Sequence, residues 1–471
     1  MRVIFTDNKL KLTFLADTHH FSHTLGTDGG AYELRSGSDQ KCLAETGAII
    51  DAAFKRISES DTDAVMLVGD LSDDGERVCH EEMREKLYAL QRSKPVYVTV
   101  ATHDWCCDGN PRRYVGDDTF NDVPTLGPEQ LRDFYFDFGP KQAISEYITP
   151  QGLFSYVVEL GGNVRLLALN DDRNGVEGVD FTGSGFSEEH FLWIEQQLRD
   201  AAENGKTVIG MEHHLLVAHV HKLVTGGSTC VRNREYVASR LADAGLKYMF
   251  VGHSHIQDIM RFTSPAGNTL TEVNVGSLCG YPAPIVQVCV ENGEVTVEVE
   301  YLESFEYNGT QDAQEYLKRH LYKLVDRVLE GAAYGDKAEY AARFSALGLP
   351  AEKLLKLRPV IKPAAKFLLN STAGELSKKL RHLGLGRFVD KQALAEFSDT
   401  KTMDFVHDIL CSLFDGGRVI HSPDSNYCRL VCGVLSIPSH LFKKAGIAKE
   451  LNECALRLVT GNELNNYPTL L

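Results

Sequence analysis

Short, largely apolar segments recur along the first part of this chain, with helical patterns between them. Examples are Ala64–Val68, Pro95–Val100 and Leu246–Val251. Strands that are buried on both faces have such continuous apolar runs, because neither face meets water. Apolar residues at helical spacing mark helices over residues 43–58, 77–90 and 187–198, the last capped by Ser187. This alternation is typical of an α/β sandwich.

The remaining segments complete this domain and predict a second one. Residues 2–6 and 9–16 indicate a hairpin that turns at Asp7-Asn8, and alternating residues over 270–275 and 285–301 indicate antiparallel strands. Residues 105–150 form a long connection with glycine and proline. From about residue 311 apolar residues recur at helical spacing. We therefore predict an α/β domain over residues 1–305 and an all-helical domain over 306–471.

Composition excludes several classes of protein. The chain has 471 residues and a net charge of −16, which disfavours binding to nucleic-acid polymers or to anionic membranes. The N-terminal segment lacks the apolar core of a secretory signal, and no run approaches the roughly 20 apolar residues of a membrane helix. The eleven cysteines show no disulfide framework. We expect a cytoplasmic protein with reduced thiols.

Polar residues with metal-binding side chains follow five of the predicted strands. In sheets of this class ligands gather beyond the carboxyl ends of the strands, and histidine with carboxylate suits zinc, iron or manganese. Single members could serve in different ways, since Asp70 could cap the next helix and His213 could be a core histidine. Together they predict a metal site. The candidates are Asp17, His19, Asp70, His103, Asp104, His213, His214, His253 and His255.

The last of these strand ends is Gly252-His253-Ser254-His255. We expect the glycine to let the backbone bend there, since it has no side chain to restrict it. Alternate residues of an extended segment point the same way, so both imidazole rings can face one point. This turn therefore predicts two of the metal ligands.

The order and spacing of these motifs resemble the calcineurin-like metallophosphoesterases over roughly residues 10–300. The matching motifs are Asp17-x-His19, Gly69-Asp70, His103-Asp104, His213 and Gly252-His253-x-His255. Within that family the chain looks most like the bacterial class III cyclic-nucleotide phosphodiesterase-like proteins with a C-terminal helical domain. That finer resemblance rests on His253-Ser254-His255-Ile256-Gln257-Asp258, Gly276-Ser277, Tyr281-Pro282 and the helical tail.

The resemblance implies a four-layer α/β/β/α sandwich with two bound ions of manganese, iron or zinc. By position, one metal would be held by Asp17, His19 and His255. The second would be held by His213 and His253, and Asp70 would bridge the two. His213 rather than His214 matches the ligand of the family's His-His-Pro stretch. Hydroxide bound between the metals would attack the phosphorus atom.

The resemblance also assigns roles beside the metals. His103 would bind phosphate or protonate the leaving alkoxide, and Asp104 would orient its ring. The family has Gly-Asn-His where this chain has Ala101-Thr102-His103, and the asparagine normally ligates the second metal. Because a threonine hydroxyl is a poorer donor than an amide carbonyl, we expect Thr102 to leave the second site weaker or more hydrated.

The function expected from these observations is metal-dependent hydrolysis of a phosphodiester, cyclic nucleotides included. One alternative is a phosphomonoesterase, protein phosphatases included, with the same site. Others are an enzyme with one tightly and one loosely bound metal, and a weakened scaffold that binds a protein partner. The expected ligand is a small phosphoester such as a nucleotide. The oligomeric state is not predicted, although the helical domain could support a homodimer.

Several other polar residues receive a structural interpretation. We expect Asp73 and Asp74 to cap the next helix, with support of the metal ligands as the alternative. We expect Arg112 and Arg113 to form a solvated surface, with contact to a phosphate as the alternative. Cys106 and Cys107 are expected to be structural thiols. None of the histidines near the motifs is expected to be a further ligand; these are His23, His219 and His221.

Overall fold

The computed structural model describes residues 9–161, 163–172, 184–220, 230–346, 351–418, 421–437, 439 and 445–471. The chain divides into two compact units. The first comprises residues 1–32, 41–316 and 466–471, and the second comprises residues 33–40 and 317–465. The predicted first arm of an N-terminal hairpin, residues 2–6, lies outside the described residues.

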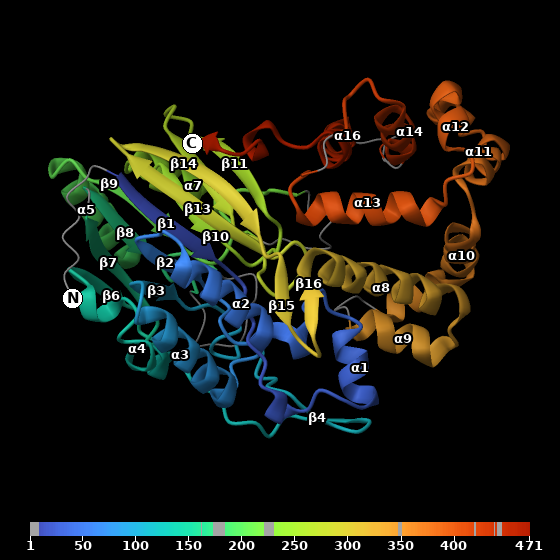
Figure 1. Ribbon diagram of the computed structural model, residues 1–471. Coiled ribbons are helices and arrows are strands. Elements are labelled where there is room, and N and C mark those ends of the chain that lie inside the picture. Colours follow the sequence, from blue (N-terminus) through green and yellow to red (C-terminus); the bar gives the residue numbers. More distant parts are fainter. Residues whose placement is uncertain are drawn as a thin grey trace. The chain divides into compact units, whose positions relative to one another are not determined.

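A six-stranded mixed sheet forms one half of the first unit (Figure 1). Its strand order is β17-β14-β13-β1-β2-β3. The strands β1, β2 and β3 are parallel to one another. On the other side of β1, β13 pairs antiparallel with β1, and β14 pairs antiparallel with β13. The bounds are β1 (Lys9–Leu15), β2 (Ala64–Val68), β3 (Val96–Thr99), β13 (Pro284–Glu291), β14 (Glu294–Tyr301) and β17 (Thr469–Leu470).

A seven-stranded sheet forms the other half, in the order β11-β12-β10-β9-β8-β7-β6. Its four central strands, β12, β10, β9 and β8, are parallel, and antiparallel strands complete both edges. The bounds are β6 (Ser145–Ile148), β7 (Phe154–Gly161), β8 (Val164–Ala168), β9 (Thr207–Met211), β10 (Tyr248–Val251), β11 (Asp258–Thr263) and β12 (Thr269–Asn274).

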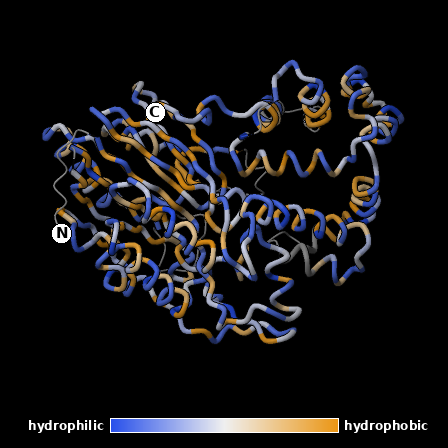
Figure 2. The backbone as a smooth tube through the Cα atoms, viewed as in Figure 1, coloured by the Kyte–Doolittle hydropathy of each residue, from blue (hydrophilic) through white to orange (hydrophobic). Residues whose placement is uncertain are grey.

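The two sheets pack face to face. The rings of Phe14 in β1 and Phe250 in β10 stack with their centroids 3.9 Å apart. The Tyr156 hydroxyl in β7 donates a hydrogen bond of 2.7 Å to the carbonyl of Val98 in β3. Every residue of β2 and β3 is buried, which explains the continuous apolar runs in the sequence. Hydrophobic residues run along these strands in Figure 2.

Helices cover the outer face of each sheet and complete four layers (Figure 1). The helices α2 (Thr46–Glu59) and α3 (Arg77–Gln91) lie on the six-stranded sheet. On the other sheet lie α5 (Glu188–Glu203) and α7 (Arg234–Asp243), whose apolar side chains share one core with β8 and β10. Ser187 caps α5 as predicted, since its hydroxyl accepts from the amide of His190. The predicted α/β sandwich is confirmed.

The connection after β3 contains more regular structure than the sequence indicates. Residues 105–150 include the hairpin of β4 (Arg113–Val115) and β5 (Asp118–Phe120), the short helix α4 (Pro128–Phe134), and the edge strand β6. These elements are only three to seven residues long. Elements that short give little periodic signal, so the sequence indicates only a long connection.

The second unit is built from helices, as predicted for the C-terminal part. The helix α8 (Ala313–Tyr334) belongs to it from Leu317 onward, and Leu317 and Leu321 of the predicted helical stripe are both buried. Further α-helices that the structure describes wholly or partly in this unit are α1 (Gly30–Ser36), α9 (Lys337–Ala346), α10 (Ala351–Asn370), α11 (Ala373–His382), α12 (Lys391–Phe397), α13 (Thr402–Phe414), α14 (Asn426–Leu435) and α16 (Ala445–Thr460). Small apolar clusters of described residues join several of these helices.

The last residues differ from the prediction of an all-helical C-terminal part. Thr469–Leu470 form β17, which pairs antiparallel with β14 of the first unit. A second exception is the small hairpin of β15 (Ser304–Glu306) and β16 (Thr310–Asp312), which lies at the predicted domain boundary. Two- and three-residue strands are set by their partners rather than by their own sequence.

Candidate metal centre

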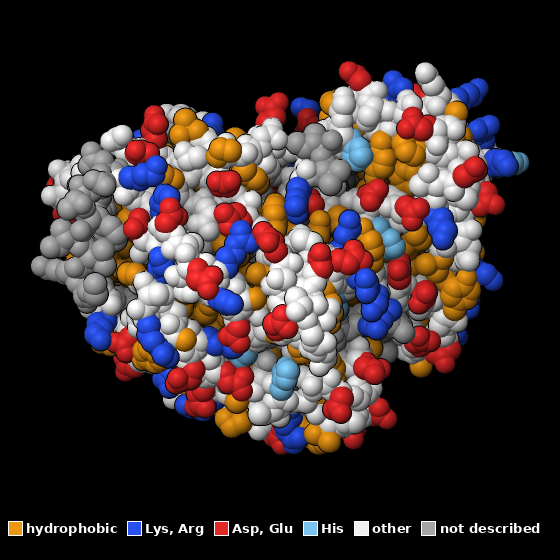
Figure 3. All heavy atoms as spheres, viewed as in Figure 1, with side chains coloured by type: hydrophobic (Ala, Val, Ile, Leu, Met, Phe, Trp, Pro, Cys, Tyr) orange, Lys and Arg blue, Asp and Glu red, His pale blue; other side chains and the backbone are white. Residues whose placement is uncertain are grey.

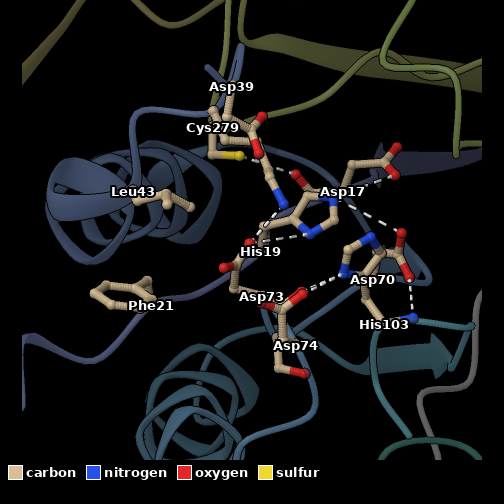
Figure 4. A network of polar contacts seen from close by, with 12 residues as sticks. Asp17, His19, Phe21, Asp39, Leu43, Asp70, Asp73, Asp74, His103 and Cys279 are labelled. Carbon is tan, nitrogen blue, oxygen red and sulfur yellow. Dashed lines mark hydrogen bonds and ion pairs between the residues drawn. The ribbon is translucent and has the colours of Figure 1, made fainter. Parts of the chain in front are cut away.

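Strand ends in both sheets bring the predicted ligand residues together. Figure 4 shows Asp17, His19, Asp70 and His103 converging from three different segments. In the six-stranded sheet β1, β2 and β3 are parallel neighbours, and in the seven-stranded sheet β9 and β10 are. The carboxyl ends of parallel neighbours meet at one edge of their sheet. The residues follow β1 (Asp17, His19), β2 (Asp70), β3 (His103), β9 (His213) and β10 (His253, His255).

Asp17, His19 and His255 form the first group. The Nε2 atoms of His19 and His255 lie 3.1 Å apart. Asp17 Oδ1 lies 3.8 Å from His19 Nε2 and 3.6 Å from His255 Nε2. Asp17 and His19 are fully buried, and His255 is partly exposed. Three donor atoms at these separations can surround one cation, because ligands with bonds of about 2.0–2.2 Å lie roughly 3–4 Å apart.

Asp70, His213 and His253 form the second group. Asp70 Oδ2 lies 3.0 Å from His213 Nε2. The same oxygen lies 3.7 Å from Nε2 of His19 in the first group. Asp70 therefore stands between the two groups. The rings of His213 and His253 have their centroids 5.3 Å apart.

The chemistry of these groups suits metal ions. Burial raises the pKa of Asp17 to about 7 and lowers the pKa values of His19 and His253 well below the usual range. Buried polar groups of this kind need pairing or a bound cation. Imidazole nitrogen and carboxylate oxygen together are donors for zinc, iron or manganese rather than calcium. The residues present therefore fit a transition-metal site, and the ion's identity does not follow from them.

The backbone at these residues is unusual. All of Asp17, His19, Asp70, His253 and His255 have positive φ, between 39° and 66°. Such conformations cost about 1–3 kcal/mol each in a residue with a side chain, and they persist where the surrounding structure imposes them. Their concentration at the five strand-end residues indicates that the turns are shaped to present side chains.

Two glycines provide room for the side chains of candidate ligands. A Cβ atom on Gly252 would lie 2.6 Å from Asp17 Oδ2, and one on Gly69 would lie 2.6 Å from His213 Nδ1. Gly69 also has a positive φ of 74°, whereas Gly252 does not. The expectation that Gly252 lets the backbone bend is therefore wrong. Gly252 is required because Asp17 approaches the backbone closely, and His253 and His255 make the turn.

Comparison with known proteins identifies the family. A model of the calcineurin-like phosphoesterases matches residues 10–257. The chain belongs to the calcineurin-like phosphoesterase family. That resemblance is confirmed, whereas the closer one to class III phosphodiesterases stays a prediction.

The solved structures that match this chain are distant from it in sequence. They include a dimetal phosphatase from Danio rerio, with a TM-score of 0.43, 12% identity and coverage of 65% of this chain and 98% of that one. A purple acid phosphatase from yellow lupin gives a TM-score of 0.39, 12% identity and coverage of 65% and 53%. A 5'-nucleotidase precursor from Thermus thermophilus gives 0.36, 14% identity and coverage of 68% and 59%. A search of curated proteins found no match.

In this phosphoesterase His103 lies beside the metal-binding groups. Its backbone amide donates a hydrogen bond of 3.1 Å to Asp70 Oδ1, and its ring lies edge-on to the His19 ring at 4.8 Å. Ring atom Nδ1 contacts the Asp73 carbonyl and lies 3.3 Å from Asp74 Oδ1. Burial lowers the pKa of His103, but Asp70 and Asp74 outweigh it and raise the pKa to about 9.

The predicted role of Asp104 as the partner of His103 is wrong. The Asp104 carboxylate accepts hydrogen bonds from the backbone amides of Leu71, Ser72 and Ala101, at 2.8, 2.9 and 2.9 Å. These bonds tie the turn after β2 to the turn after β3. Asp104 therefore supports the backbone that carries Asp70 and His103, and Asp74 is the carboxylate at the His103 ring.

The prediction that Asp73 and Asp74 cap a helix is also wrong. The N-terminal cap position of α3 is Glu76, which makes no capping hydrogen bond with its side chain. Asp74 instead accepts from Arg112, at 2.7 Å from Nε, so Arg112 is not part of a solvated surface. Asp73 accepts from the buried Lys41 Nζ at 2.5 Å. The two carboxylates thus link the region beside His103 to basic residues from elsewhere in the chain.

Thr102 lies in the buried turn between β3 and His103. Its carbonyl accepts a hydrogen bond from the amide of Cys107 at 3.1 Å. The assignment of its side chain as a weak ligand of the second metal stays a prediction.

The structure also tests the interpretations of polar residues outside the predicted site. Arg113 pairs with the exposed Asp122, and all eleven cysteines are free thiols. His219 lies between Asp258 and Glu272, which gives it a structural role, and His221 is outside the described residues. Sequence reasoning missed the buried pair Asp171 and Asp172, although they follow β8 as the other candidates follow their strands.

No helix in the described part of the chain combines the length and the apolarity needed to cross a bilayer. Acidic and basic side chains are interspersed over the face shown in Figure 3.

Proposed function

We propose that this phosphoesterase hydrolyses phosphodiesters at a dinuclear metal centre. Asp17, His19 and His255 hold one ion and His213 and His253 hold the other. The position of Asp70 carries the proposal, because one carboxylate oxygen lies 3.7 Å from His19 Nε2 and 3.0 Å from His213 Nε2. A carboxylate that reaches both ligand groups can bridge two metal ions held close together.

Two ions bound there would supply Lewis acidity toward the phosphoryl oxygens and lower the pKa of an attacking water. His103 binds the phosphoryl group or protonates the leaving alkoxide. Its Nδ1 is engaged by Asp73 and Asp74, which leaves Nε2 for the substrate. The Asp74 carboxylate, whose Oδ1 lies 3.3 Å from Nδ1, favours the protonated ring that a proton donor requires.

The preference for diesters, including cyclic nucleotides, rests on the resemblance of the Gly252–Asp258 segment and the helical tail to class III phosphodiesterases. The test is turnover of bis-p-nitrophenyl phosphate and p-nitrophenyl phosphate, first with chelator and then with Mn²⁺. We expect chelator to abolish turnover, Mn²⁺ to restore it, and the diester to be the better substrate. Faster monoester turnover would favour a phosphatase. Failure of both substrates with folded protein would favour a binding scaffold.

Thr102 is the observation that favours a weakened second site. Replacing it with asparagine restores the amide carbonyl of the family pattern, so we expect Thr102→Asn to tighten binding of the more weakly held metal. Competition with a chelator of known affinity measures this effect. If the affinity of neither metal changes, the residue 102 side chain does not reach the second ion.

Arg112 is expected to act on the reaction through Asp74 and His103. Arg112→Ala removes the basic partner of a buried carboxylate that contacts the His103 ring, so we expect kcat to fall about 10–100-fold. Metal content should stay unchanged, because the carboxylate that Arg112 pairs with, Asp74, is not one of the proposed ligands.

The matched control is Arg113→Ala, because Arg113 pairs with the exposed Asp122. Exposed pairs contribute little, so this variant should keep kcat close to that of the wild type. Equal losses in both variants would mean that the Arg112–Asp74 contact does not position His103.

A further inference from the structure

A third cluster of metal-binding side chains lies outside both proposed ligand groups. Asp171 and Asp172 follow β8, and His214 follows β9, the parallel neighbour of β8. All three residues are buried, with exposed fractions of 1%, 1% and 4%. One donor atom from each lies within 4.8 Å of the others. Parallel strands thus place these three side chains together as they place the proposed ligands.

The separations of the donor atoms suit a cation. His214 Nδ1 lies 3.0 Å from Asp171 Oδ1 and 3.8 Å from Asp172 Oδ1. Ligands bound to one metal at about 2.0–2.2 Å are roughly 3–4 Å apart. An ordinary histidine–aspartate pair would explain the first distance, with Nδ1 donating its proton to Asp171. It does not explain why a second carboxylate is held at the same nitrogen.

Asp172 supplies the independent observation. Its Oδ2 accepts a hydrogen bond from Trp105 Nε1 at 3.0 Å, but its Oδ1 has no hydrogen-bond partner although the residue is buried. A buried carboxylate oxygen without a partner is costly. The neighbouring carboxylate makes the cost larger, because one His214 ring can balance the charge of only one of the two acids.

A further buried carboxylate near the cluster adds to its negative charge. Glu212 precedes the two histidines after β9, is fully buried, and has no hydrogen bond to either carboxyl oxygen. The His214 ring lies 4.3 Å from the His253 ring, so the cluster adjoins the second proposed ligand group. A cation at Asp172 would relieve the shortage of positive charge.

We propose that Asp171, Asp172 and His214 bind a third metal ion, a divalent transition-metal cation. Two carboxylates and one imidazole are donors of the class that binds zinc, manganese or iron. Binding replaces the proton on His214 Nδ1 by the cation and leaves Asp171 Oδ1 and Asp172 Oδ1 as the oxygen ligands. This site goes beyond the proposed dinuclear centre and does not depend on it.

The test is the number of Mn²⁺ ions bound per chain, measured by equilibrium dialysis of the full chain against Mn²⁺ alone followed by elemental analysis. Wild-type protein is expected to bind about three ions, two at the dinuclear centre and one at the third site. Asp172→Asn keeps the size of the side chain and can still accept from Trp105, so it should bind one ion fewer. Asp70→Asn should lose the dinuclear pair and keep the third ion.

Asp200→Asn is the matched control, because Asp200 is an exposed acid paired with Arg165, and its metal count should equal that of the wild type. Equal counts in Asp172→Asn and wild type overturn the third site. A wild-type count of two that Asp70→Asn removes also overturns it, without any variant at the cluster, and leaves the dinuclear centre standing. A single ion that is lost in Asp172→Asn but kept in Asp70→Asn supports the third site and contradicts the dinuclear proposal.

Discussion

Replacing Asp70 with asparagine is expected to remove most metal binding and to lower phosphoester turnover by at least about 10³-fold. The neutral amide cannot balance two cations, and its nitrogen cannot ligate the one near His213. A loss of about 4 kcal/mol of transition-state stabilisation corresponds to this factor, and charge stabilisation by bound metals amounts to several kcal/mol. The measurements are kcat/KM with Mn²⁺ present and metal content after dialysis.

The matched control for that change is Asp122→Asn. Asp122 is an exposed acid that pairs with Arg113 on the surface, so its loss should change neither metal content nor turnover. Asp70→Asn has almost the same size as the native residue and should fold. A variant that turns over at near the wild-type rate would show that Asp70 does not bridge two metals.

The sequence could indicate that the candidate ligand residues lie close together, because the pattern that places them is local and recurs at each strand. A strand buried on both faces must be apolar, as every residue of β2 is, so the first polar residues after it mark the sheet edge. Parallel pairing then brings edges such as those of β1 and β2 together without further information. Asp17 and Asp70 could therefore be placed near each other from the pattern of strands alone.

The partners of those residues could not be predicted in the same way. Asp104 follows His103 directly, which suggests that it orients that ring, yet its carboxylate turns to the amides of Leu71 and Ser72. Asp74, which is 29 positions earlier in the chain, takes the place at His103. The backbone path of the turns decides which of two nearby carboxylates reaches the His103 ring. The turn after β2 has an unusual path, since Asp70 has a positive φ. No periodicity records such a path.

Contacts between distant segments set the other limits. β17 is only two residues long and is fixed by its pairing with β14, whose residues precede it by more than 160 positions. Arg112 is one of two adjacent arginines, and only the fold shows that it pairs with a buried carboxylate while Arg113 pairs with an exposed one. Both positions are arginine, and the burial of the paired carboxylate gives the two side chains different roles.

The second large effect is expected from Gly252→Ala. The backbone of Gly252 is not in the left-handed region, so alanine can adopt its conformation. The new Cβ would lie 2.6 Å from Asp17 Oδ2, a distance that real Cβ atoms do not reach, and 3.1 Å from the Val68 carbonyl. Because Val68 belongs to a buried strand, Asp17 must move instead.

A shift of Asp17 would disturb both His255 and the backbone amide of His253, to which both Asp17 oxygens are hydrogen-bonded at 3.0 Å. Since a misplacement of about 1 Å can cost roughly 10²-fold in rate, we expect kcat/KM to fall by at least that factor. The affinity of Asp17, His19 and His255 for their metal ion should also fall, and titration with a chelator measures that affinity.

Gly47→Ala is the matched control, because Gly47 lies in α2 and the nearest atom to its added Cβ is 3.5 Å away. Alanine is favoured over glycine in a helix by up to about 1 kcal/mol, so this variant should keep its activity and gain slightly in stability. If Gly252→Ala retained wild-type turnover and metal affinity, Asp17 would have room to move without loss, and it would not be a fixed ligand. Selective loss in Gly252→Ala would instead show that the strand-end glycine is retained for the space it leaves to the carboxylate.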